Sequence, residues 1–317
     1  MHRICAASVN DNRGLVAGPA RRSPVEFRRR QEDRTCKGGS SVSLIAPVRP
    51  NPARPATIED RYFQFSTVDG TSDLETTYRI RYQVYCIERG FLPQGSYPAR
   101  LETDEYDACA LHMLARHRAG EPAGTARLVM HSPMGFPILK HCVFTGEHAF
   151  LNDPSDPRLL TYGEISRVAI SKIFRRRVGD TPYGGPPRTD SSSTGAADVV
   201  EFPASKDAPE ILLGLLRQIY HECKRRGLTH LMLACERSLY VMMRRLGFLI
   251  VPAGPEVDYY GPVRPYVASI QALEEEHRDK YPERLRYMIR GLEPELIPGF
   301  ARDLDVPRGR RRSLAAA

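Results

Sequence analysis

The pattern of apolar and polar positions predicts a series of strands between residues 60 and 300. Short apolar or alternating runs bounded by turn residues are typical of strands. Such runs lie near residues 62–66, 111–116, 125–131, 161–171, 230–235, 248–251 and 263–270. Gly120, Pro122 and Gly124 separate the second run from the third, which predicts a hairpin at this point.

Helical spacing of apolar residues predicts three helices between these strands. A capping box formed by Ser72 and Glu75 opens the first helix. The second helix begins at Asp207 and ends at Gly227, and a short third helix covers residues 239–246. This order of elements predicts an α/β (α+β) fold, in which a mixed, twisted sheet carries helices on both faces.

The two ends of the chain lack this periodicity. Residues 1–58 and 301–317 are basic and poor in apolar runs, so they cannot bury enough surface to offset the entropy of ordering. We expect two disordered basic tails around one domain at residues 59–300. The first tail fits either a segment that binds a partner or an extension from a misplaced start codon. A low-complexity stretch at residues 179–204 predicts a long surface loop inside the domain.

The net charge of +8 belongs to the ends of the chain. Residues 1–55 carry +7 and residues 307–317 carry +4, which leaves −3 for residues 56–306. A basic tail attracts polyanions without being the function of the domain, so we do not expect nucleic acid as the partner.

Cysteine usage and hydropathy restrict the compartment. The seven cysteines are scattered and never form a C-x-x-C pair, which is typical of reduced thiols rather than of disulfides or a metal site. No apolar run approaches the roughly 18–20 residues of a membrane span. We therefore expect a cytoplasmic protein with no metal and no membrane span.

Arg81 is the first residue that points to chemistry. It shares a helical stripe with Tyr78 and Tyr85, where an unpaired guanidinium would be costly to bury. Asp104 and Asp107, three residues apart, are candidate partners. The alternative is an Arg81 that extends into solvent beside a hydrated acidic loop.

Charged residues also occur inside predicted strands. In the strand at 161–171, alternation places Glu164 and Ser166 on one face and Arg167 on the other, and Arg127 lies in an earlier strand. The pattern fits a polar site around a splayed central strand. It fits an exposed cross-strand ion pair equally well.

Together these residues resemble the GNAT acyltransferase superfamily. The motifs follow in the order and spacing of the acyl-homoserine-lactone synthases and the related N-acyl amino acid synthases. They are Arg81-x-x-Val84-Tyr85, Glu102-x-Asp104-x-Tyr106-Asp107, Arg127, Glu164-x-Ser166-Arg167, and Tyr240 with Leu246-Gly247-Phe248. Residues 81–91 and 164–177 are most similar to the acyltransferase family associated with the PEP-CTERM/exosortase system.

The resemblance implies a GNAT-like fold and the transfer of a fatty acyl group from a thioester to the amine of a small acceptor such as an amino acid. It implies Glu164 as the base. It also implies a charged network on the acceptor side made of Arg81, Asp104, Asp107, Arg127 and Arg167. Phe91 and Val168 replace aromatic residues usual in the synthases, so we do not expect a homoserine-lactone product. The alternative function is a non-catalytic GNAT-like module that binds acyl carrier protein or lipid.

The donor is the remaining question. The superfamily's pyrophosphate loop is only half present, because Arg176 and Gly179 fit it and Thr181 does not. Basic residues at 172–177 and 224–226 favour an acidic acyl carrier protein over coenzyme A, although cations at helix ends are often simply solvated. The expected co-substrate is therefore acyl-phosphopantetheine, or else acyl-CoA, with no permanently bound cofactor. The predicted donor-binding residues are Lys172, Arg175, Arg176, Arg177, Gly179 and Tyr240.

Overall fold

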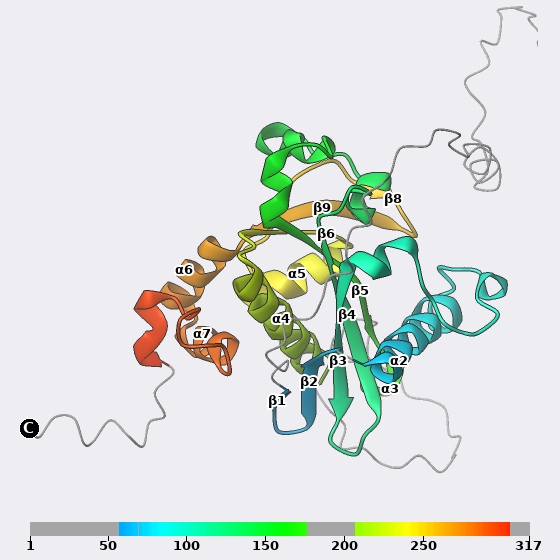
Figure 1. Ribbon diagram of the computed structural model, residues 1–317, viewed down its shortest axis with the longest axis horizontal. Coiled ribbons are helices and arrows are strands. Elements are labelled where there is room, and N and C mark those ends of the chain that lie inside the picture. The colour runs from blue at the N-terminus through cyan, green and yellow to red at the C-terminus, as the bar shows by residue number, and fades with distance from the viewer. Residues whose placement is uncertain (1–56, 69, 176–206, 305–317) are drawn as a thin grey trace, which may run out of the picture. The chain divides into compact units, whose positions relative to one another are not determined.

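The computed structural model describes residues 57–68, 70–175 and 207–304. Their strands form one mixed sheet in the order β1-β2-β3-β4-β5-β6-β9-β7, and β8 pairs with β9 (Figure 1). The strands are β1 Ile58–Glu59, β2 Phe63–Thr67, β3 Ala110–His117, β4 Pro122–Met130, β5 Tyr162–Ile170, β6 His230–Cys235, β7 Val251–Pro252, β8 Val257–Asp258 and β9 Pro262–Ser269.

Six α-helices accompany the sheet within the described ranges. They are α2 Thr71–Tyr82, α3 Lys172–Arg175, α4 Asp207–Arg226, α5 Arg237–Arg245, α6 Ile270–Lys280 and α7 Pro282–Ile289. A π-helix, η1 Gln83–Glu88, continues α2 directly. Short 3₁₀ turns fill the connections, namely η2 Gln94–Ser96, η3 Glu105–Cys109, η4 Pro137–Lys140, η5 Gly146–Asn152, η6 Pro157–Thr161 and η7 Gly299–Leu304.

Two neighbouring strands of the sheet, β5 and β6, diverge along their length. All neighbours in it are antiparallel except β5 and β6, which run parallel. Their pairing covers only Tyr162 to Glu164 against His230 to Met232, although both strands continue beyond it. The strands therefore diverge after Glu164, and the gap between them has to be filled by side chains or by a ligand.

Helices cover both faces of the sheet, as the sequence predicts. On one face α4 packs over the strands around Phe65 and Met113. On the other, Ile80 of α2 and Val84 of η1 pack against Leu114 of β3. Figure 1 shows α2 and α4 on opposite sides of β3 and β4. The C-terminal helices α6 and α7 extend the core on the α4 side.

Six of the seven predicted strands are present with small shifts at their ends, and β3 and β4 form the predicted hairpin. The strand at 248–251 is wrong. Phe248 and Ile250 are buried in the core but pair with no strand, and only Val251 and Pro252 join β9. The alternation in this segment therefore reflects burial rather than strand pairing.

Helix ends were predicted with mixed success. Gly227 and Gly247 follow α4 and α5 with φ of +65° and +83°, which confirms both as helix stops. The capping box is wrong, because the first helix begins at Thr71 after Gly70 and no side chain caps it. Ser72 already lies inside the first turn, where its carbonyl accepts a hydrogen bond from the Thr76 hydroxyl.

The described residues extend slightly beyond the predicted domain bounds of 59 and 300. Ile58 is buried and pairs with Phe65 in β1, and Ala301 is buried in η7. The remainder of both predicted tails and the low-complexity stretch at 179–204 lie outside the described residues. No helix in the described ranges is both long enough and apolar enough to cross a bilayer.

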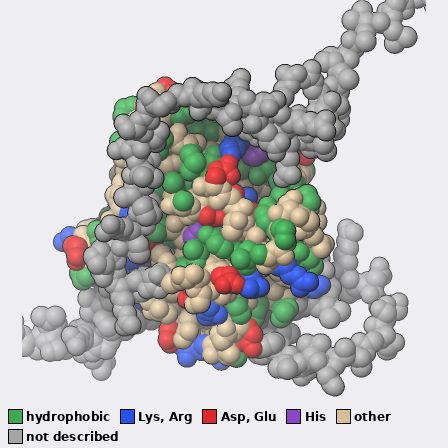
Figure 2. Space-filling view, turned by 45° about the vertical axis from the view of Figure 1, so that its right-hand side comes forward, with side chains coloured by type: hydrophobic (Ala, Val, Ile, Leu, Met, Phe, Trp, Pro, Cys, Tyr) green, Lys and Arg blue, Asp and Glu red, His purple; other side chains and the backbone are tan. Residues whose placement is uncertain are grey.

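Charges are mixed on the surface of the domain. Figure 2 shows Lys and Arg side chains interspersed with Asp, Glu and apolar ones on the face drawn there. This mixture agrees with the small negative balance of residues 56–306.

Asp60, near the start of the domain, forms hydrogen bonds with residues near its end. Its carboxylate accepts hydrogen bonds from Arg217 of α4 at 3.3 Å, from the Tyr287 hydroxyl of α7 at 2.6 Å, and from Arg290. Arg217 is fully buried, and this burial lowers the pKa of its guanidinium. Asp60 is therefore needed to compensate a desolvated positive charge.

We expect Asp60→Ala to lower the free energy of unfolding by about 3–5 kcal/mol, because it leaves the buried Arg217 unpaired. Asp73→Ala is the matched control, since the Asp73–Arg116 pair is partly exposed and should be worth less than about 1 kcal/mol. Urea unfolding followed by circular dichroism measures both. Equal losses in the two variants would contradict this role of Asp60.

Candidate active site

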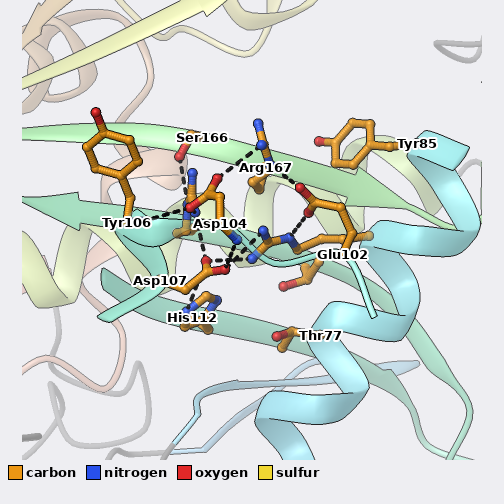
Figure 3. A network of polar contacts seen from close by, with 12 residues as sticks. Thr77, Tyr85, Glu102, Asp104, Tyr106, Asp107, His112, Ser166 and Arg167 are labelled. Carbon is orange, nitrogen blue, oxygen red and sulfur yellow. Dashed lines mark hydrogen bonds and ion pairs between the residues drawn. The ribbon is translucent and has the colours of Figure 1, made fainter. Parts of the chain in front are cut away.

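Six charged side chains from five parts of the chain meet in one network beside β5 (Figure 3). Three are arginines and three are acids, so the network is neutral as a whole. Its members are Arg81 of α2, Glu102 and Asp104 of the following loop, Asp107 of η3, Arg127 of β4 and Arg167 of β5.

Arg81 is fully buried between two acids. Its Nε donates to Glu102, and its Nη1 donates to Asp107 Oδ1 at 2.7 Å. Burial opposes the charge of Arg81, but the two carboxylates outweigh it and raise its pKa. The predicted ion pair with Asp107 is present, and the alternative of an Arg81 extended into solvent is excluded.

The acids are held in place by the backbone as well as by arginines. Asp104 caps η3 by accepting from the Tyr106 N–H at 3.0 Å, and Asp107 accepts from the Asp104 N–H at 2.8 Å. Arg127 Nη1 then donates to both carboxylates, at 2.5 and 2.7 Å. Burial alone would raise the pKa of Asp107, but Arg81 and Arg127 hold it down at about 2. These acids are therefore ionised at any physiological pH.

A β-bulge brings Arg167 into this network. Thr125 pairs with Ala169 and Arg127 pairs with Ser166, so two residues of β5 face one residue of β4. Arg167 adopts a left-handed φ of +51°. Its guanidinium donates to Glu102 at 3.1 Å and to Asp104 at 3.0 Å. The expectation from strict alternation, which placed Arg167 on the face opposite Glu164 and Ser166, is therefore wrong.

A mainly apolar cavity of about 270 Å³ lies where β5 and β6 diverge. Aliphatic side chains of β5, β6, α4 and α5 line it, including Ile165, Leu212, Leu233 and Met242. Among the six network residues, Arg167 is the one that lines this cavity. Glu102 and Asp104 bind Arg167 directly, and Arg81, Asp107 and Arg127 hold those two acids in turn.

Glu164 lines the same cavity where the strands begin to diverge. Its side chain is buried, and its Oε2 accepts a hydrogen bond from the Ile138 N–H at 2.8 Å. Burial raises the pKa of Glu164 to about 7, although Ile138, Arg127 and Arg167 each favour the ionised form. Glu164 forms no ion pair among the described residues, so it is not the cross-strand salt bridge of the alternative interpretation. A carboxyl group with this pKa can accept and release a proton near neutral pH.

The predicted donor-binding residues are not brought together in the described ranges. Lys172 is exposed at the start of α3, and the ring of Tyr240 stacks on Tyr266 at 4.9 Å without lining the cavity. Arg176, Arg177 and Gly179, together with the side chain of Arg175, lie outside the described residues. The role of these residues in donor binding stays a prediction.

The basic end of α4 has partners within the domain. Lys224 pairs with Glu274, Arg225 with Glu293, and Arg226 with Glu222. These pairs account for the charge of residues 224–226, so that this segment gives no support to a carrier-protein surface.

Two groups of the site are not among the residues predicted from the sequence. The first is Glu102, which is part of the quoted motif, is fully buried, and joins Arg81 to Arg167. Its position in the sequence, two residues before Asp104, is the feature that could have indicated its role. The Ile138 N–H that binds Glu164 left no signal, because a backbone donor has no residue preference.

Residues 80–181 match the family model described as "Acetyltransferase (GNAT) domain". The match includes all six residues of the charged network and Glu164, so the segment that carries the candidate site is similar to a GNAT acetyltransferase domain. The mixed sheet with one diverging parallel pair is correspondingly GNAT-like. The search of curated proteins found no match.

The solved structures that are similar to this chain include the following three proteins. TofI, in a ternary complex with an inhibitor and MTA, is 20% identical, with 72% of this chain and 94% of that chain covered and a TM-score of 0.46. The CoA-dependent acyl-homoserine lactone synthase BjaI, with SAM and isopentyl-CoA, is 18% identical, with 66% and 82% covered and a TM-score of 0.43. FeeM, an N-acyl amino acid synthase from uncultured soil microbes, is 12% identical, with 68% and 94% covered and a TM-score of 0.42.

Removal of Glu102 should be severely destabilising. We expect Glu102→Ala to cost about 3–5 kcal/mol, because it leaves the buried Arg81 without its Nε partner. Glu105→Ala in the same loop removes an exposed pair with Lys140 and should cost less than about 1 kcal/mol. Thermal and urea unfolding of both variants checks this, and a near-neutral Glu102→Ala would show that the network tolerates an unpaired arginine.

Glu164→Gln should change the pH dependence of stability. A carboxyl whose pKa rises from 4.5 to about 7 on folding stabilises the protein below pH 4.5, and this contribution is lost as the pH rises through 7. Glutamine stays neutral and can still accept from Ile138. The variant should therefore gain on the order of 3 kcal/mol over the wild type between about pH 5 and 8. Melting temperatures across this range measure the difference, and a variant that is less stable at pH 8 would point to an ionised, paired Glu164 instead.

Proposed function

We propose that the protein is an N-acyltransferase that moves a fatty acyl group from a thioester to the amine of a small acceptor such as an amino acid. One observation carries this proposal. Within the acyltransferase segment, a buried carboxyl with a pKa near 7 lines an apolar cavity beside an arginine held in a fixed position. Such a site combines a proton acceptor, a cationic contact and a place for an acyl chain.

The cavity supports a fatty acyl group as the transferred unit. Ile165, Leu233 and Met242 offer the apolar contacts that stabilise a hydrocarbon chain out of water. Exclusion of water by an apolar lining would also protect a thioester from hydrolysis before the amine attacks.

Arg167 supports an acceptor that carries an anionic group. Its Nε and Nη2 are bound to Glu102 and Asp104, whereas its Nη1 has no hydrogen-bond partner among the described residues. The Arg167 side chain lines the cavity and keeps about a fifth of its surface exposed. A carboxylate of an amino acid fits this edge of the guanidinium.

In the reaction that we propose, Glu164 takes a proton from the acceptor's ammonium group. The free amine then attacks the thioester carbonyl carbon. Collapse of the tetrahedral intermediate breaks the C–S bond, and the thiolate leaves as a thiol after it takes the second proton from nitrogen. The products are an N-acyl amide, a free thiol and one proton on Glu164, which returns to solvent.

We propose an acyl carrier protein as the donor, with coenzyme A as the alternative. The support is the basic stretch at residues 172–177, which follows directly after β5. Lys172 at its start is exposed, two residues beyond the cavity-lining Ile170. The cytoplasmic location and the link to the PEP-CTERM/exosortase system belong to this proposal as well.

The test is a transfer assay with acyl donors of short, medium and long chain, supplied both as coenzyme A and as carrier-protein thioesters. A mixture of amino acids and other small amines serves as acceptor, and mass spectrometry detects the N-acyl products. Transfer from carrier-protein thioesters alone would support the proposed donor. Saturable donor binding without transfer would favour the non-catalytic module.

Glu164→Gln should lose turnover by roughly 10²–10⁴-fold, because an amide cannot accept the proton. In the wild type, kcat/KM should rise with pH to a plateau with an apparent pKa of about 7, since the base must be deprotonated. Glu105→Gln, an exposed change outside the cavity, is the control. A Glu164→Gln variant with wild-type turnover would move the base to another group.

A further inference from the structure

Two irregular elements face each other at the cavity. One is the π-helix η1, which continues α2 and carries Tyr85. The other is the bulge of β5, where Arg167 and Val168 oppose one residue of β4. Both depart from regular backbone geometry, and such departures persist only when surrounding contacts support them.

Tyr85 contacts both residues of the bulge. Its hydroxyl donates a hydrogen bond to the carbonyl oxygen of Val168 at 2.9 Å, and the guanidinium of Arg167 lies 5.8 Å from the centre of its ring. On its other side the ring stacks on Phe91 at 6.5 Å. The Tyr85 side chain thus reaches from the π-helix to the bulge across the edge of the cavity.

The bulge needs such a support. A strand bulge leaves backbone groups without ladder partners, and Arg167 adds the cost of a left-handed φ. A shift of register by one residue would turn neighbouring side chains to the other face of β5. Because Glu164 precedes the bulge and Arg167 lies in it, loss of the bulge would turn Arg167 relative to Glu164, and both of these groups line the cavity.

We propose that Tyr85 is a positioning residue, whose hydroxyl holds the Arg167–Val168 bulge in register next to Glu164. The inference rests on the proposed function for its catalytic consequence, but the structural role of the hydroxyl does not. Tyr85 takes no proton and touches no bond that is made or broken. Its effect on the reaction passes through Arg167 and the backbone of β5.

Tyr85→Phe is the test, because it removes one oxygen atom and keeps the ring. The peptide covering residues 164–170 should exchange its amide hydrogens about tenfold faster, whereas a peptide covering 110–117 should be unchanged. In the transfer assay, kcat should fall about tenfold and the KM of the acyl donor should stay within about twofold. Tyr97→Phe is the matched control: its ring packs edge-on against Tyr82 and does not line the cavity, so neither readout should move.

The outcomes separate this inference from the proposed function. Unchanged exchange at 164–170 in Tyr85→Phe would overturn it. Faster exchange with an unaltered kcat per folded molecule would also overturn it, because the hydroxyl would then be merely structural. A wild-type protein that transfers no acyl group would refute the proposed function instead, and the exchange measurement would still decide whether Tyr85 holds the bulge.

Discussion

The structure depends on the burial of guanidinium groups inside a small domain. Arg81 and Arg127 have no exposed surface, and each would be strongly destabilising without carboxylates at hydrogen-bonding distance. The acids that compensate them come from one short loop, residues 102–107. Helix α2, this loop, β4 and β5 are therefore fixed relative to one another by electrostatics as much as by apolar packing.

The same constraint separates two kinds of carboxyl group. Asp107 lies between arginines that hold its pKa low. Glu164 lies a short way along the sheet, where a backbone N–H is its hydrogen-bond partner among the described residues, and burial raises its pKa. Arg167 connects the two environments, since it is bound to the acids and also lines the cavity. Because its three arginines and three acids balance in charge, the network holds Arg167 in place without pairing with the group best suited to accept a proton.

Most of the sheet and the pairing of Arg81 with Asp107 could be predicted from the sequence, because apolar periodicity and the cost of a buried charge are both visible in it. The strand at 248–251 could not be told from a buried connection, since both alternate in the same way. The position of Arg167 depends on a bulge, which breaks the period of two that the prediction assumes. The hydrogen bond from the Ile138 N–H to Glu164 and the one from Tyr85 to the Val168 carbonyl could not be predicted either. In both, one partner is a backbone group, which nearly every residue type has.

The contacts of Asp60 have a consequence for how the chain is made. Asp60 precedes β2, yet two of its partners, Tyr287 and Arg290, follow more than two hundred residues later. During synthesis from the N-terminus, α4 emerges with Arg217 long before α7 exists to complete the cluster. Two of the three side chains that bind Asp60 are therefore made only when nearly the whole domain has been synthesised, so the start of the domain reaches its final packing late.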